Sequence, residues 1–377
     1  MTEWVAVSLG ALDIADNPAF PSGEILVTPV RPGVPLTLFG RGAAVWRRLV
    51  DAGPVHDSRL DDAERGIVRE MAEIGLVSMR PEDENRVTSL SSAWLSSPLH
   101  EMVYALVANV ALKNGIQAVF IKGPILHRQG LRERVHSGDI DVWVPAGQQH
   151  ELLRHLRAWG WTEIPFDFAE EMYHSTTLEP NIWGCEIDIH FRYPGIGVSP
   201  KDAFNELVRN SEMAEFAGVA CSVPTVAANA VIYALHNIRP DPKVAITSEM
   251  RRDAQKALAL GGLAAVELSD RWRALAVLGP EFVAADPTLV LPKYTAGIPA
   301  DWQHRQAATV AGYHFAVMRS LPWRRRPLAI WRVLWPSART AKLSATRQGY
   351  PDDTALVAHL RRIGLGIAQI VRRRSKR

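Results

Sequence analysis

The most constraining feature of this sequence is the segment DIDVWVP, residues 139–145. Successive side chains of a β-strand point to opposite faces, so Asp139 and Asp141 share one face while Ile140 and Val142 share the other. The segment therefore predicts a strand that enters a core on one side and presents two carboxylates on the other. Because neighbouring like charges repel, such a pair requires a positive partner, and a metal ion is one candidate.

A second segment, CEIDIHFRY (residues 185–193), repeats the arrangement. In a strand, Glu186, Asp188 and His190 fall on one face and the apolar residues between them fall on the other. Either acidic segment alone has a plain alternative, a solvated or salt-bridged surface strand. The recurrence of the pattern favours a shared site.

If the two strands are neighbours, Asp139, Asp141 and Asp188 converge. Three carboxylates are hard oxygen ligands of the kind that Mg²⁺ prefers, and two such ions can hold nucleotide phosphates and polarise an attacking hydroxyl. We expect replacement of any of the three aspartates by asparagine to abolish such chemistry with little effect on folding, because it removes charge repulsion.

Composition limits the class of protein. The chain has 377 residues, of which 47% are hydrophobic, enough for two or three domains with real cores. We expect no signal peptide and no membrane-spanning helix, and only two cysteines occur, so we expect a cytoplasmic protein without a cysteine-based zinc site. The loop motifs of P-loop NTPases and the GxSxG motif of α/β-hydrolases are absent from the sequence.

The pattern of apolar residues predicts several units and an α+β fold with a mixed sheet. Strand-like EILVTPV and PLTLF, two helical segments and a returning strand predict a winged-helix-like module over residues 1–80. Polar residues 81–96 predict a flexible linker. Alternating helices and strands predict a catalytic core over 97–222, with a first helix that begins at Ser97-Pro98, and helical patterns predict a helical domain over 223–318.

The segment IKGPILHRQGLRERVHSGDIDVWVP, followed later by EIDIHFRY, resembles the nucleotidyltransferase superfamily with the DNA polymerase β-type palm. More narrowly, it is similar to the uncharacterised nucleotidyltransferase branch whose strand–turn reads Lys-Gly in place of Gly-Ser. The resemblance covers about residues 97–260. It implies that Asp139, Asp141 and Asp188 bind two Mg²⁺ ions and that Asp188 activates the acceptor hydroxyl.

The same resemblance places Lys122 and Gly123 at the turn that meets the triphosphate of an NTP. This sequence departs from the superfamily there, since Pro124 follows the glycine where a serine is usual. Phosphate binding is then expected to depend on backbone N–H groups and on Lys122, Arg132 or Arg134. For each of these three, a solvated surface charge is the alternative.

Two histidines near these motifs have competing interpretations. His190 shares the face of Asp188, so it could contact the nucleotide or metal, or simply end the strand. His236 lies on an apolar helix and is expected to be a core residue. Only the resemblance to the nucleotidyltransferase branch favours a role for it in the site.

The N-terminal segment PLTLFGRGAAVWRRLVDAG…EMAEIGLVSMR is similar to PqqD-like domains, winged-helix units that bind leader peptides. This resemblance covers about residues 20–80. It implies peptide binding by addition of a strand to a sheet edge, which we expect in EILVTPV. The competing interpretation is a DNA-binding winged helix, but many acids occur in this module, so no DNA contact is expected.

The C-terminal segment 319–377 is strongly basic, with 15 Lys and Arg against two acids. We expect its aromatic helices to pack on the helical domain; contact with RNA or with an anionic membrane is the less favoured alternative. Together these features predict a Mg²⁺-dependent nucleotidyltransferase whose acceptor is a peptide or small molecule. The alternatives are a non-catalytic peptide-binding adaptor and a toxin–antitoxin type transferase that modifies a protein or RNA.

Overall fold

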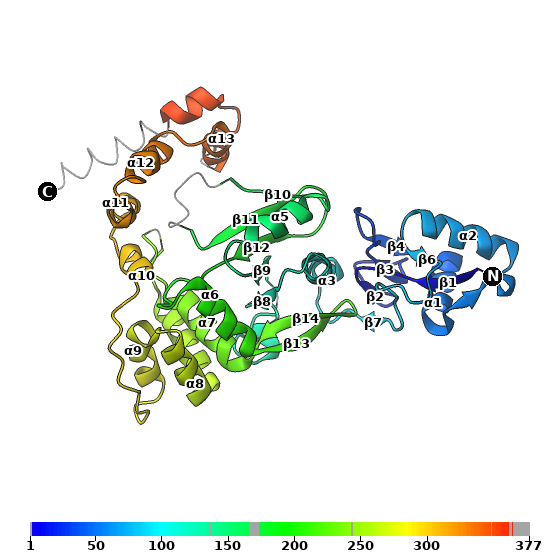
Figure 1. Ribbon diagram of the computed structural model, residues 1–377, viewed down its shortest axis with the longest axis horizontal. Coiled ribbons are helices and arrows are strands. Elements are labelled where there is room, and N and C mark those ends of the chain that lie inside the picture. The colour runs from blue at the N-terminus through cyan, green and yellow to red at the C-terminus, as the bar shows by residue number, and fades with distance from the viewer. Residues whose placement is uncertain are drawn as a thin grey trace.

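The computed structural model describes residues 2–135, 137–165, 173–242, 244–347, 349–361 and 364 (Figure 1). Helices and several small sheets make up an α+β fold, which confirms the fold class predicted from the sequence. Figure 1 shows an elongated molecule with the N-terminal unit at one end, a central sheet, and the C-terminal helices at the other end.

The N-terminal unit packs two helices, α1 (Gly40–Ala52) and α2 (Asp62–Glu73), against two small sheets of order β5-β1-β6 and β4-β3-β2-β7. Trp46 of α1 is fully buried, and its indole N–H donates to the Leu76 carbonyl at 2.9 Å. A short 3-10 helix spans Asp57–Arg59. The strands are β1 (Glu3–Ala6), β2 (Ala11–Asp13), β3 (Ile25–Val27), β4 (Leu36–Leu38), β5 (Val55–His56), β6 (Val77–Ser78) and β7 (Ser91–Ser92).

The segment EILVTPV forms a central strand, so the expectation that it offers a sheet edge is wrong. Its strand β3 pairs antiparallel with β2 on one side and with β4 on the other. Ile25, Leu26 and Val27 are all buried, which is the pattern of a strand covered on both faces. Strand β4, which pairs with β3, is the edge strand on that side of the sheet.

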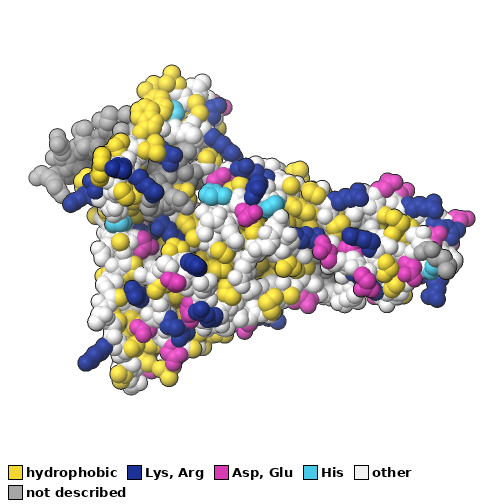
Figure 2. Space-filling model, viewed as in Figure 1, with side chains coloured by type: hydrophobic (Ala, Val, Ile, Leu, Met, Phe, Trp, Pro, Cys, Tyr) yellow, Lys and Arg dark blue, Asp and Glu magenta, His cyan; other side chains and the backbone are white. Residues whose placement is uncertain are grey.

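Several acids of this unit pair with arginines. Arg41 pairs with Asp61 and Arg48 pairs with Glu64 at 3.2 Å, so charges of both signs alternate over α1 and α2. Figure 2 shows the same mixture over the narrow end of the molecule.

Residues 81–96 are also not the flexible linker that their polarity predicts. Val7 pairs with Arg86 in an isolated bridge, and the Arg86 guanidinium donates to the Gly53 carbonyl at 2.6 Å. Strand β7 then runs parallel to β2. Backbone pairing, which polarity alone does not reveal, holds this segment against the N-terminal unit.

The N-terminal unit and the following helix α3 (Pro98–Lys113) share a buried apolar cluster. A Cβ atom at Gly10 would lie 2.8 Å from the Cβ of Ala105, so the chain approaches α3 here as closely as only glycine permits. The Ala11 amide donates to the Ala217 carbonyl at 2.9 Å across the same junction. The buried members of the cluster are Leu12, Ile14, Leu26, Met102, Ala105 and Ala217.

The central sheet has the order β10-β11-β12-β9-β8, in which β12 and β9 are parallel and the other pairs are antiparallel. Asp188 of β12 lies directly opposite Asp141 of β9, which confirms the expectation that the two acidic strands are neighbours. The strands are β8 (Val119–Ile121), β9 (Asp139–Trp143), β10 (Trp161–Glu163), β11 (Ser175–Pro180) and β12 (Glu186–His190).

Helices cover both faces of this sheet. Phe120, Ile140 and Ile187 point to the face that packs on α3 and on α5 (Gln149–Arg157), and α3 begins at Ser97 and Pro98 as predicted. Val119 and Trp143 point to the opposite face, where they pack in one cluster with α6 to α9. These helices are α6 (Pro200–Arg209), α7 (Val226–Ile238), α8 (Ser248–Arg271) and α9 (Leu275–Ala285). The aspartates lie on this second face.

The remaining elements are the short helix α4 (Ile125–Arg128), the hairpin β13 (Ser211–Phe216) and β14 (Val219–Pro224), and the C-terminal helices α10 (Ala300–Arg305), α11 (Val310–Ser320), α12 (Arg326–Leu334) and α13 (Ala338–Arg347). Trp323 and Trp331 are 71% and 61% exposed, so the expectation that the aromatic side chains of this segment pack on the helical domain is wrong for these two. Figure 2 shows basic and hydrophobic side chains together over these helices. The basic residues 371–377 lie outside the described residues. Among the helices that the structure describes, none has both the length and the hydropathy to cross a membrane.

Candidate functional site

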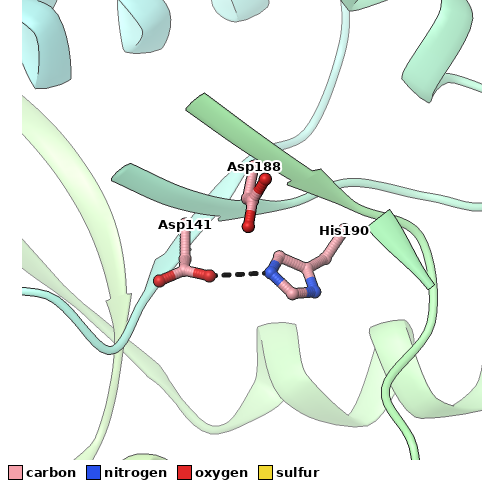
Figure 3. Close-up of side chains that lie close together, drawn as sticks. All are labelled: Asp141, Asp188 and His190. Atoms are coloured by element: carbon pink, nitrogen blue, oxygen red, sulfur yellow. Dashed lines mark hydrogen bonds and ion pairs between the residues drawn. The ribbon is translucent and has the colours of Figure 1, made fainter. Parts of the chain in front are cut away.

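Asp141, Asp188 and His190 form a compact group on the second face of the central sheet (Figure 3). One ligand atom from each of the three side chains lies within 4.8 Å of the others. His190 Nε2 is 2.8 Å from Asp141 Oδ1, and both side chains are buried. The parallel pairing of β9 and β12 produces this arrangement because it places equivalent positions of the two strands side by side.

Lys122 supplies the positive charge that the sequence requires beside the aspartates. Its Nζ lies 2.6 Å from Asp141 Oδ1, and the two side chains are only 13% and 4% exposed. Burial alone would raise the pKa of Asp141, but the charge of Lys122 and the hydrogen bond with His190 hold it well below its usual range. Burial likewise works against the charge of Lys122, and Asp141 outweighs it and raises the lysine pKa.

This ion pair corrects one expectation from the sequence. Loss of the Asp141 charge would not relieve repulsion, because it would leave the Lys122 ammonium buried without its partner. Asp141 is therefore part of the folding energetics as well as of the site.

The other two acids are less buried. Asp188 accepts a hydrogen bond from Thr177 Oγ1 of the adjoining strand β11 at 2.5 Å. Asp139 lies in register with Glu186 and accepts from Ser137 Oγ at 3.0 Å, and it is outside the three-residue group. Its role as a metal ligand stays a prediction.

The Lys-Gly turn has a left-handed backbone conformation that few residues other than glycine adopt. Lys122 and Gly123 have φ values of 58° and 57°, and the Lys122 amide donates to the Asn229 side chain on α7 at 3.1 Å. A Cβ atom at Gly123 would lie 2.4 Å from the Tyr104 hydroxyl, so only glycine fits. The turn bends the chain so that the Lys122 side chain reaches Asp141.

The two arginines expected at the phosphates differ in their surroundings. Arg132 donates through Nη2 to the Gly123 carbonyl at 2.9 Å and through Nε to the Arg134 carbonyl at 2.8 Å. It thus braces the turn, while the Arg134 side chain is exposed. Their role toward phosphate stays a prediction.

His236 of α7 lies near the same turn. Burial and the charge of Lys122 lower its pKa to about 3, so it is neutral at physiological pH. His236 is expected from the sequence to be a core residue, but it is half-buried, and its Nδ1 has no hydrogen-bond partner among the described residues.

Sequence reasoning missed several residues that surround the group. Thr177 and Asn229 are ordinary polar residues in their segments, and only tertiary contacts bring them to Asp188 and Lys122. Arg192, Arg239 and Arg305 lie around Tyr173 and His174, beside the group, and no spacing in the sequence connects the three arginines.

Comparisons with known proteins identify no family for this chain. No protein-family model matches the chain, and no curated protein matches it. Among solved structures, the chain has a likeness to a tRNA nucleotidyltransferase complexed with a primer tRNA and an incoming ATP analog. The TM-score is 0.21 at 12% identity, over 71% of this chain and 99% of that one. A TM-score this low supports no inference about fold or function.

The chemistry of the donor set fits a divalent cation. The two carboxylates suit Mg²⁺ and Mn²⁺, which prefer oxygen ligands. The imidazole nitrogen is more typical of first-row transition metals such as Zn²⁺ and Fe²⁺. Lys122 Nζ and His190 Nε2 both contact Asp141 Oδ1, so a cation would compete with them for that oxygen or bind the other carboxylate oxygens of the group.

Proposed function

We propose that the chain is a metal-dependent nucleotidyltransferase that moves a nucleoside monophosphate from an NTP to a hydroxyl or phosphate acceptor. An acceptor oxygen attacks the α-phosphorus, the bond to the β-phosphate breaks, and pyrophosphate leaves. The observation that carries the proposal is the convergence of Asp141, Asp188 and His190 beside the Lys122-Gly123 turn.

Each residue has a defined task in this proposal. Asp141 and Asp188, with His190 and Asp139 beside them, would hold the divalent cation, which when bound neutralises phosphate charge and promotes loss of the acceptor proton. Asp188 is the more exposed carboxylate of the group, so it can receive that proton from the acceptor hydroxyl. Lys122 holds Asp141 in its ionised form.

Label position in the NTP tests this proposal directly. We expect the native chain, supplied with a divalent cation and the peptide and small-molecule fractions of a cell extract, to transfer label from the α-phosphate of one NTP and to release pyrophosphate. Label in the γ-phosphate should remain in the pyrophosphate. Cation and NTP together should also raise the melting temperature, since a ligand at about 100 times its Kd stabilises a fold by about 2.7 kcal/mol. Transfer of γ-label to the acceptor would contradict the proposal.

We further propose that the N-terminal unit binds the acceptor when the acceptor is a peptide, as PqqD-like domains bind leaders. The free edge strand β4 is the place for an added strand. Val34 and Phe39 flank this strand and are both exposed, so they offer apolar contacts to the side chains of a bound segment.

A substitution in β4 separates strand addition from other modes of binding. We expect peptides selected on the native chain from a displayed random library to lose binding to Thr37→Pro and to keep binding to Thr37→Val. Proline disrupts pairing along the edge, whereas valine retains the backbone N–H and favours a strand. Thr37 is exposed, so the core should stay intact, and equal melting temperatures of the variants would verify this. Unchanged binding to a folded Thr37→Pro variant would exclude the β4 edge.

A further inference from the structure

We infer that Arg239 and Arg305, with Arg192 beside them, form the binding site for the terminal phosphates of the NTP. The inference rests on the proposed function and names where the leaving pyrophosphate of that reaction is held. Three separate elements supply these residues. Arg192 follows β12, Arg239 follows α7, and Arg305 ends α10.

The two principal arginines meet at one histidine. Arg239 Nη1 lies 2.9 Å from His174 Nε2, and Arg305 Nη2 lies 3.4 Å from His174 Nδ1. Arg192 donates to the backbone carbonyl of the preceding residue, Tyr173, through Nε at 3.0 Å and through Nη2 at 2.6 Å. Three guanidinium groups therefore gather around residues 173–174.

His174 cannot satisfy both arginines. A neutral imidazole has one donor and one acceptor nitrogen, and a guanidinium only donates. A protonated ring has no acceptor nitrogen at all, so the conflict holds whatever the protonation of His174. One of the two contacts therefore sets an N–H against an N–H. An anion that accepts from both guanidinium groups would remove this conflict.

The charge balance also favours an anion. Burial lowers the pKa of Arg305, and the neighbouring charge of Arg239 lowers it further, although the group remains charged at any physiological pH. The nearby carboxyl of Asp301 on α10 has its pKa raised by burial, against the effect of Arg192. Both arginines are half-buried, and Asp301 is a carboxyl of the described residues whose charge acts on Arg305. A multiply charged anion would add further compensation to the two guanidinium groups.

The position relative to the acidic group identifies the class of ligand. The ring centroids of His174 and His190 are 5.4 Å apart. His174 therefore lies between the arginines, which contact it, and the Asp141–Asp188–His190 group. One region attracts cations and the other attracts bare anions. A ligand that spans both must carry a metal-bound part and a further free anionic part, as a nucleoside triphosphate does. Bidentate guanidinium–phosphate hydrogen bonds match this geometry.

Inorganic tripolyphosphate is the probe for the test, because it lacks the base and cannot be used for transfer. We expect calorimetric titration of the full chain to show binding, and each of Arg239→Gln and Arg305→Gln to weaken it by about tenfold or more. The matched control is Arg154→Gln, an exposed arginine of α5, which should change the affinity less than twofold. Inorganic phosphate should bind much more weakly than tripolyphosphate; equal binding of the two would point instead to a single phosphate group, as on an acceptor.

A second measurement needs no variant and so is independent of any folding defect. Phenylglyoxal modifies accessible arginines, and mass spectrometry of the native chain would quantify modification at each site. We expect tripolyphosphate to protect Arg239 and Arg305 and to leave Arg154 unprotected. Equal modification with and without the probe, or full affinity in folded glutamine variants, would overturn the inference.

The two proposals fail separately. Arginine-dependent tripolyphosphate binding without nucleotide transfer would leave the anion site in place and contradict the nucleotidyltransferase. Transfer that is unaffected in both glutamine variants would contradict the anion site and leave the nucleotidyltransferase proposal in place.

Discussion

Asp141→Asn is expected to lower the free energy of unfolding by about 3–5 kcal/mol, because it leaves the buried Lys122 ammonium without its partner. The 2.6 Å contact between nearly inaccessible side chains is the basis of this value. The folded state depresses the pKa of Asp141, so its contribution is complete above the unfolded pKa of about 4 and is lost as the pH falls below it. Urea unfolding at neutral pH therefore measures the full effect.

A double variant distinguishes this explanation from a general disturbance of the sheet. Lys122→Met removes the cation and retains most of the side-chain volume. We expect the variant that combines Asp141→Asn with Lys122→Met to recover at least half of the lost stability, since replacing a whole buried ion pair is often close to neutral. If the double variant is as unstable as Asp141→Asn alone, the ion pair is not the cause.

Asp188→Asn should have the converse effect, with a large loss of transfer and little loss of stability. As the residue proposed to receive the acceptor proton, Asp188 is expected to contribute about 10²–10⁴-fold to the rate. It is half-buried, and an asparagine oxygen can still accept the hydrogen bond from Thr177. The measurement is the initial rate of α-label transfer, with the melting temperature as the control for folding.

Thr177→Val provides the graded comparison. It keeps the shape of the side chain and removes the hydrogen bond that orients the carboxylate, so we expect a smaller loss, about 10–100-fold. A transfer rate in Asp188→Asn within twofold of the native rate would exclude Asp188 from the reaction. A Thr177→Val rate below that of Asp188→Asn would show that the threonine itself contacts the reacting groups.

Local pattern predicted the parts of the site that depend on alternation. The apolar and acidic positions of the two strands placed Asp141 and Asp188 on one face, and the buried side of each strand fixed that choice, because a shift of one residue would bury the acids in the α3 core. The start of α3 could also be predicted from local sequence, because Ser97 caps the helix and Pro98 is its first residue.

Other features depend on tertiary contacts that no local pattern encodes. The Lys122–Asp141 pair forms because two antiparallel strands bring the end of β8 to β9. Strand β3 is central because β4 returns beside it. Its apolar run indicates only that both of its faces are covered, not whether it is a central or an edge strand. The convergence of Arg192, Arg239 and Arg305 requires three elements to meet, so sequence spacing carries no trace of it.

The close junction at Gly10 has a consequence for how a peptide acceptor would be chosen. Arg86, Ser91 and Ser92 pair with the N-terminal unit, and Gly10 lies against Ala105, so the N-terminal unit is packed directly on α3. A peptide docked on β4 would then be held at a fixed place on the molecule, and each further extended residue would span about 3.3 Å. In the proposed transfer reaction, the chain would then act as a molecular ruler, which selects the acceptor side chain by its distance along the peptide instead of by the identity of its neighbours.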